Sequence, residues 1–278
     1  MQLGIFAKTF ARSTVEEVFD AVAGLGLCCA QFNFACAGLP SLPDEIDPVL
    51  LERIHRAAAD HGIAIAAVSA TFNLIHPDVE QRRDGLRRLG VIAAACARLG
   101  TKIVTLCTGT RDPENMWRRH PDNDSAAAWR DLLATFSDAL RIADDHDIAL
   151  GIEPETGNVI DSAQKARRLL DELKSPRLKI IMDAANLFHP ADRSRQREIL
   201  DEAFDLLGGD LVLAHAKELG SDGHAGSLAL GAGVLDWSHY LSLLRRANFT
   251  GPLILHGFKE QQAALSTDFL GKQLTVSN

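Results

Sequence analysis

Short apolar runs alternate with longer amphipathic stretches along the whole chain. The apolar runs are five to seven residues long, which is typical of β-strands buried on both faces. They predict eight strands, at residues 2–6, 28–34, 63–69, 102–107, 148–153, 178–183, 211–217 and 252–257. Each run is followed by a stretch with the apolar spacing of an amphipathic helix, as at 14–26, 79–100 and 127–146.

This alternation predicts one (β/α)₈ barrel that spans residues 1–278. The eight strand–helix units follow one another without a linker, and barrels of this type typically have ~250 residues. A doubly wound open sheet is the alternative. That fold normally shows a Gly-x-Gly-x-x-Gly turn after an early strand, and the chain has none.

Composition and charge narrow the classes of function. The net charge is −8 and the pI is about 5.7, which argues against a nucleic-acid partner. No apolar run approaches the ~20 residues that span a bilayer, and the first residues do not resemble a signal peptide. The five cysteines form no Cys-x-x-Cys pair, so we expect reduced thiols in a cytoplasmic protein without a membrane partner.

Metal-competent side chains stand at the ends of the later strands. The segment LGIEPETGN ends an apolar run in two glutamates, Glu153 and Glu155. Burying a carboxylate is costly unless it is paired, hydrogen-bonded or bound to a metal. Asp183, His215 and His256 occupy equivalent places on the next three strands. Because strand ends converge on one face of a barrel, we expect these side chains to meet there.

Glu153, Asp183, His215 and His256 are therefore predicted to hold a divalent metal ion. Carboxylate oxygen and imidazole nitrogen together favour manganese, with zinc or cobalt next, and suit magnesium poorly. Each residue alone has a structural alternative. The glutamate could pair with an arginine, the aspartate could cap a turn, and either histidine could be a hydrogen-bonded core residue.

Two further polar residues are expected beside this group. Glu155 and Lys217 follow Glu153 and His215 by two residues, so the strand period places them on the same face, one layer nearer the rim. A salt bridge of Lys217 with Glu155 or Glu218 is the structural alternative.

Other strand ends and two loops supply candidates for substrate contact. These candidates are Asn33, Asn73, His76, Arg111, Asn186, Gly231 and Gly233. The loop 108–124 is longer than a plain connection, and with Trp117 among arginines it could close over an anionic or polyhydroxy ligand. A solvated or subunit-contact loop is equally compatible with it. The glycine-rich loop 219–233 would allow backbone close to a ligand such as a phosphate, or could simply be flexible.

Several segments resemble the xylose-isomerase-like barrel superfamily of sugar phosphate isomerases and epimerases. They are GIEPE at 151–155, IIMDAAN at 180–186, LAHAKE at 213–218, GAGVLDW at 231–237 and TFNLIHPD at 71–78. The resemblance covers almost the whole chain and implies a metal held by Glu, Asp, His and Glu. The chain departs from that pattern at His256, which replaces the last glutamate, and at Asn186, where many relatives have histidine.

The resemblance implies an enzyme that isomerises or epimerises a sugar, sugar phosphate or sugar acid through an enediolate. Glu153 would be both a metal ligand and the base, Lys217 would hold a substrate oxygen or act as an acid, and Glu155 would assist from the rim. A metal-bound imidazole cannot also take a proton, so His256 cannot serve as a second base. An aldose–ketose isomerase with one base is therefore slightly favoured over a two-base epimerase.

Other members of the superfamily leave alternatives open. A non-catalytic sugar-binding barrel and a dehydratase of a keto-polyol both remain compatible with the residues. The nuclease relatives need further histidine ligands, and Asn33 stands at the first such place, which disfavours a nuclease. The expected partner is a small sugar, and a homo-oligomer is left open.

Overall fold

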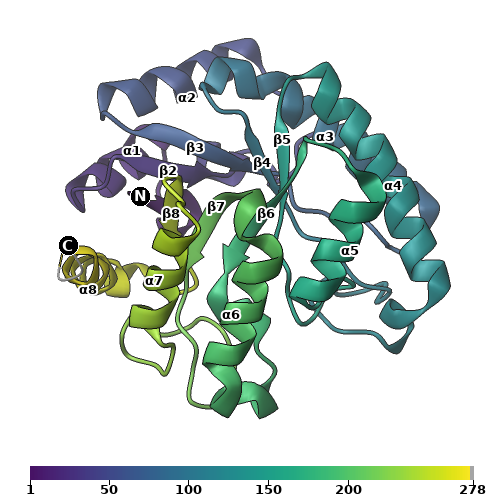
Figure 1. Cartoon of the computed structure of the whole chain (residues 1–278). Coiled ribbons are helices and arrows are strands. Elements are labelled where there is room, and N and C mark those ends of the chain that lie inside the picture. The colour runs from purple at the N-terminus through teal and green to yellow at the C-terminus, as the bar shows by residue number, and fades with distance from the viewer. Residues whose placement is uncertain (276–278) are drawn as a thin grey trace.

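The computed structural model describes residues 1–275, apart from the side chains of residues 190, 191 and 193. Eight parallel strands close into a barrel in chain order (Figure 1). The strands are β1 (Gln2–Phe6), β2 (Cys29–Phe32), β3 (Ala64–Ser69), β4 (Ile103–Leu106), β5 (Ala149–Ile152), β6 (Leu178–Asp183), β7 (Leu211–Ala216) and β8 (Pro252–Leu255). The predicted (β/α)₈ barrel is confirmed, and the open-sheet alternative is excluded because β8 pairs with β1.

The helices form an outer ring around the strands, as Figure 1 shows. They are α1 (Val15–Gly24), α2 (Pro48–Asp60), α3 (Val79–Leu99), α4 (Ala126–Asp145), α5 (Ala163–Leu173), α6 (Gln196–Leu207), α7 (Trp237–Arg246) and α8 (Ala263–Thr275). Short 3₁₀ helices lie at Ala7–Thr9, Phe34–Ala37, Pro121–Asp124, Ala184–Leu187, Pro190–Arg195, Gly208–Asp210 and Glu260–Gln262. Within residues 1–275, no helix has the length and apolarity needed to cross a membrane.

Local signals in the sequence explain where helices begin and end. Thr14 accepts a hydrogen bond from the backbone of Glu17, whose side chain returns to the backbone of Thr14, and this capping box starts α1. Gly100 ends α3 with a left-handed φ of 73°, which costs glycine little because it has no Cβ.

Apolar side chains fill the barrel interior beneath the strand ends. A small apolar cluster inside it consists of Cys29, Ala67, Ile181, Leu213 and Ile254. Gly4 leaves no room for a side chain, since a Cβ there would lie 2.5 Å from the sulfur of Cys29. Ile181, Leu213 and Ile254 each stand two residues before a polar residue at the end of their strand, so the strand period places this packed layer beneath the polar side chains.

Strand pairing shifts register at two places below the open end. One shift lies between β2 and β3 at Ala30/Gln31, and the other between β6 and β7 at Ile180/Ile181. Register shifts of this kind re-aim the side chains that follow them. The residues that follow are Gln31 on β2, and Asp183 paired with His215 across β6 and β7.

Several predicted strands are longer than the strands in the structure. Asn33 has left β2 and starts a 3₁₀ helix, while Glu153 and His256 each come directly after the last residue of their strand. Hydrophobic patterning does not show where a strand stops pairing, so these boundaries differ by one or two residues.

Candidate metal centre and active-site cavity

Four polar side chains meet at the open end of the barrel. Glu153 follows β5, Asp183 ends β6, His215 lies on β7 and His256 follows β8. One ligand atom from each lies within 4.8 Å of the ligand atoms of the other three. The side chains therefore converge on one point from four consecutive strands.

The close polar contacts within this group each join a carboxylate oxygen to an imidazole nitrogen. Nδ1 of His215 lies 3.2 Å from Oε2 of Glu153 and 3.7 Å from Oδ2 of Asp183. Nε2 of His256 lies 2.9 Å from the same Asp183 oxygen. The two imidazole rings are adjacent, with centroids 4.2 Å apart.

This donor set fits a divalent metal ion. Nδ1 of His215 is buried and makes no well-aligned hydrogen bond. Its neighbours are carboxylate oxygens of Glu153 and Asp183, and oxygen and imidazole nitrogen are the ligands that manganese, zinc and cobalt accept. A bound cation would accept the lone pair of this nitrogen and offset the charge of both carboxylates.

Burial and charge act against each other in the cluster. Burial alone would raise the pKa of Asp183, but Lys217 and the two histidines lower it well below its usual value. Burial alone would lower the pKa of His215, but Glu153 and Asp183 raise it to about 9. Burial and the neighbouring His215 lower the pKa of His256. Without a cation, the cluster therefore holds its positive charge on His215 rather than on His256.

A second chain of contacts runs from Lys217 to Glu153. Nζ of Lys217 donates to Oδ1 of Asn186 at 2.6 Å, and Nδ2 of Asn186 donates to Oε1 of Glu153. The stem of Lys217 lies against Gly226 and Gly257, where a Cβ would lie 3.4 Å and 2.8 Å from it. These glycines leave room for the lysine stem and direct its ammonium group to the cluster.

Glu155 lies beside this chain, at the rim. Burial and the nearby charge of Glu153 raise the pKa of Glu155 to about 7. Its Oε2 accepts a hydrogen bond from Asn158 at 3.2 Å. Glu155 is thus a carboxyl group that can both give and take a proton near neutral pH.

Two residues that sequence patterns did not single out also contact the cluster. Nε2 of His215 lies 2.9 Å from Oε1 of Gln31, and Nε2 of Gln31 donates to Thr105 at 3.1 Å. The hydroxyl of Tyr240 lies 2.9 Å from the carbonyl oxygens of both Met182 and His215, so α7 supports the backbone next to two predicted ligands. An interior glutamine in an apolar run and a tyrosine on a helix carry no local signal of these contacts.

A cavity of about 290 Å³ opens directly over the cluster. Its wall includes Glu153, Glu155, Asn186, His215, Lys217 and His256, together with Gln31, Thr105 and Trp117. A second cavity of about 390 Å³ adjoins it and shares Trp117, Glu155, Asn186 and Lys217. The two form one cleft that leads from the cluster to the surface, with polar groups suited to a small hydroxylated ligand.

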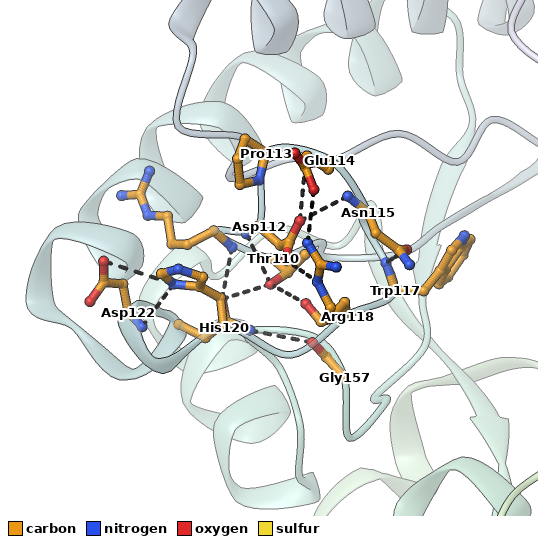
Figure 2. Close-up of polar contacts among 12 residues, drawn as sticks. Thr110, Asp112, Pro113, Glu114, Asn115, Trp117, Arg118, His120, Asp122 and Gly157 are labelled. Carbon is orange, nitrogen blue, oxygen red and sulfur yellow. Dashed lines mark hydrogen bonds and ion pairs between the residues drawn. The ribbon is translucent and has the colours of Figure 1, made fainter.

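The loop 108–124 is held by its own contacts, as Figure 2 shows. Oδ1 of Asp112 accepts two backbone N–H groups at 2.9 Å, and its other oxygen pairs with Arg118. Asn115 accepts the backbone N–H of Trp117 at 3.0 Å. The indole stands apart from these polar contacts, is 52% exposed, and lines both cavities. The loop therefore presents Trp117 to the cleft.

The arginines of this loop are engaged with carboxylates of the chain itself. Arg111 lies 2.5 Å from Asp131, and Arg119 lies 2.8 Å from Asp161. Arg111 was predicted to contact substrate, yet it does not line either cavity. Its ion pair and its bond to the carbonyl of Ile75 at 3.1 Å connect the loop to the rest of the barrel.

Three further candidates for substrate contact also lie outside the two cavities. Oδ1 of Asn33 accepts the N–H of Ala35 at 3.0 Å and starts a 3₁₀ helix. The amide of Asn73 makes three bonds to loop backbone, at 2.8, 3.0 and 3.2 Å. His76 contacts the backbone of Asp78 and Pro113 at 3.1 and 3.2 Å. In this structure these side chains hold the loops rather than face the cleft.

Gly231 and Gly233 surround a buried carboxylate and are not part of either cavity wall. Glu218 is fully buried and accepts four N–H groups, from Leu219 at 3.0 Å, Gly231 at 2.6 Å, Leu235 at 3.1 Å and the indole of Trp237 at 2.9 Å. A Cβ at Gly233 would lie 2.6 Å from this side chain. The LAHAKE and GAGVLDW segments thus meet at Glu218, which organises the loop after β7.

Comparison with known proteins agrees with this geometry. The sequence model of the xylose isomerase-like TIM barrel family matches residues 19–273. The chain belongs to this family. No curated protein matches the sequence, so the comparison rests on the family model and on solved structures.

Solved structures of sugar epimerases share the fold across the whole length of the chain. The 3-keto-D-glucoside 4-epimerase of E. coli has a TM-score of 0.76 at 19% identity, covering 99% of both chains. D-Psicose 3-epimerase of Clostridium cellulolyticum H10, solved with D-tagatose, has a TM-score of 0.74 at 15% identity, covering 99% of both chains. The IOLI protein, solved with a zinc atom, has a TM-score of 0.76 at 14% identity, covering 99% of this chain and 96% of that chain. At such identities the likeness establishes the fold.

Proposed function

We propose that this protein is a divalent-metal-dependent isomerase or epimerase of a sugar, sugar phosphate or sugar acid that acts through an enediolate. The observation that carries the proposal is the convergence of four metal-competent side chains beneath a polar cleft. The family and its structural neighbours, which include sugar epimerases, support the same reaction class.

The metal would be held by Glu153, Asp183, His215 and His256, with manganese favoured and zinc or cobalt next. When bound, the ion supplies a Lewis acid that polarises the substrate carbonyl and stabilises negative charge on its oxygen. Lys217, whose Nζ lies 3.8 Å from Oδ2 of Asp183, would hold a hydroxyl or carbonyl oxygen of the substrate. Trp117 lines both cavities and would exclude water from one face of the sugar.

Glu153 is proposed as the base that removes the proton next to the carbonyl. Its Oε2 faces the cluster, whereas its Oε1 accepts a hydrogen bond from Asn186. Glu155, with a pKa of about 7, is the second carboxyl group of the cleft and would pass protons between the rim and solvent. The exchange of a substrate proton thus needs only groups on one side of the cleft.

His256 favours an aldose–ketose isomerase over a two-base epimerase. A carboxylate can bind a metal with one oxygen and take a proton on the other, but imidazole cannot do both. The nitrogen of His256 that would be the ligand is the one beside Asp183. Proton transfer between neighbouring carbons on one face needs a single base, which Glu153 supplies. The substrate is expected to be a small cytoplasmic sugar derivative.

The test is solvent exchange of sugar protons. Purified protein loaded with manganese is incubated in deuterated water with a panel of aldoses, ketoses, their phosphates and sugar acids, and deuterium next to the carbonyl is followed by mass spectrometry. Incorporation with at least one sugar supports the proposal. Tight binding of a sugar without exchange would instead identify a non-catalytic sugar-binding barrel.

The roles of the two glutamates are separated by matched variants. Glu153→Gln is expected to lower exchange by the ~10²–10⁴-fold typical of a lost general base while retaining part of the metal affinity. Glu155→Gln, one layer nearer the rim, should reduce exchange much less. The reverse order would make Glu155 the base and leave Glu153 a ligand alone.

A further inference from the structure

Gln31 holds the imidazole of His215 from across the barrel. Oε1 of Gln31 lies 2.9 Å from Nε2 of His215, and both side chains are buried, at 4% exposure each. β2 and β7 are not neighbours, because β1 and β8 lie between them in the closed sheet. The contact therefore spans the barrel interior.

The other end of the Gln31 amide is also fixed. Its Nε2 donates to Oγ1 of Thr105 on β4 at 3.1 Å. β2 reaches this position just after its register shift against β3, at Ala30/Gln31. A buried amide is stable only when its hydrogen-bonding groups are satisfied, and here one end meets Thr105 and the other meets His215.

This geometry determines which nitrogen of His215 faces the cluster. Nδ1 points at Glu153 and Asp183, at 3.2 and 3.7 Å, and must be unprotonated to bind a cation. The hydrogen of the neutral ring must then sit on Nε2, where it needs an acceptor. The carbonyl oxygen of Gln31 is that acceptor.

We propose that Gln31 is a positioning residue that keeps the hydrogen of His215 on Nε2 and thereby sets the affinity of the cluster for its metal. The inference rests on the proposed metal site and adds a residue outside the predicted ligand set. Partners that orient a ligating histidine typically change metal affinity 10–100-fold when they are removed. Gln31 does this with a neutral amide, so it adds no charge to a cluster that already contains two carboxylates.

The first experiment measures manganese and zinc affinity by competition with a chromophoric chelator. Gln31→Met keeps the length of the side chain and removes the acceptor, so affinity is expected to fall about 10–100-fold. Gln31→Glu restores an acceptor and should bind metal at least tenfold more tightly than Gln31→Met. The matched control is Gln196→Met, which loses two hydrogen bonds at the start of α6, outside both cavities, and should bind metal like the wild type.

The second experiment reads the histidine directly. In the zinc-loaded, nitrogen-15-labelled protein, the His215 ring should carry its hydrogen on Nε2, with slow solvent exchange that becomes fast in Gln31→Met. A hydrogen on Nδ1 instead, or Gln31→Met affinity within about threefold of the wild type, would overturn the inference. Thr105→Val, which removes only the support of the Gln31 amide, gives a milder variant if Gln31→Met does not fold.

The two proposals fail in different ways. If the wild type binds no metal, the proposed function fails. The metal-free spectra still test the contact, since Gln31→Met must speed the exchange of the His215 Nε2 hydrogen. If the wild type binds metal and Gln31→Met does so equally well, the metal site survives and the role of Gln31 is refuted.

Discussion

Replacing Glu218 by glutamine is expected to destabilise the protein far more than a usual surface change. The carboxylate is fully buried and each of its oxygens accepts two N–H groups. In Glu218→Gln one oxygen becomes an NH₂ group, so two buried N–H donors face another donor. Each buried group left without a partner costs about 1–3 kcal/mol, which gives a loss of about 2–6 kcal/mol in the free energy of unfolding.

The measurement is chemical denaturation of the metal-free protein, followed by tryptophan fluorescence and circular dichroism. Glu202→Gln, an exposed position on α6, is the matched control and should stay within about 0.5 kcal/mol of the wild type. Local relaxation of the loop after β7 would place the loss at the lower end of the range. A Glu218→Gln protein as stable as Glu202→Gln would refute the claim that this carboxylate organises the loop.

Two further predictions concern exposed and buried ionisable groups. Of the five cysteines, Cys28 alone should react with iodoacetamide in the native protein near pH 8, with the labelled residues counted by mass spectrometry. Burial raises the pKa of Cys29 to about 12 and of Cys36 to about 11. Cys96 and Cys107 are shielded by burial as well. Labelling of a second cysteine before unfolding would contradict this. Lys102 and Arg177 lower the pKa of Asp147 to about 2, so its stabilising effect is present above its unfolded pKa of ~3.9 and disappears as pH falls through about 2. Asn at position 147 tolerates the same left-handed backbone. In thermal melts Asp147→Asn should therefore be less stable than the wild type at pH 6, and the difference should have largely disappeared at pH 2. A difference of the same size at both pH values would refute the assignment.

The barrel and the alignment of its strand ends could be predicted because both follow from patterns of residues that are close together in the sequence. Eight apolar runs, each followed by an amphipathic stretch, leave few other topologies. Glu153, Asp183 and His215 stand at the ends of successive runs, and parallel strands bring their ends to one face. The four-residue cluster follows from this register without knowledge of any contact between distant residues.

The loop residues could not be predicted because their roles depend on which loops meet. Asn73 and Arg111 have the chemistry of substrate-binding side chains, but the loops after β3 and β4 pack together and use that chemistry on each other. Gln31 lies in an apolar run and contacts a strand 184 residues away. Glu218 looks like a rim carboxylate, yet the loop folds back over it and buries it.

Four strand-end residues are proposed to bind one catalytic metal ion, and the metal stoichiometry of wild type and Asp183→Ala tests this directly. It is measured by plasma mass spectrometry after equilibrium dialysis against manganese. We predict one ion per wild-type chain, none in Asp183→Ala, and a rise in melting temperature with manganese in the wild type alone, because a ligand of the folded state stabilises only that state. Full occupancy in Asp183→Ala, or no ion in the wild type, would show that these four residues do not form the metal site.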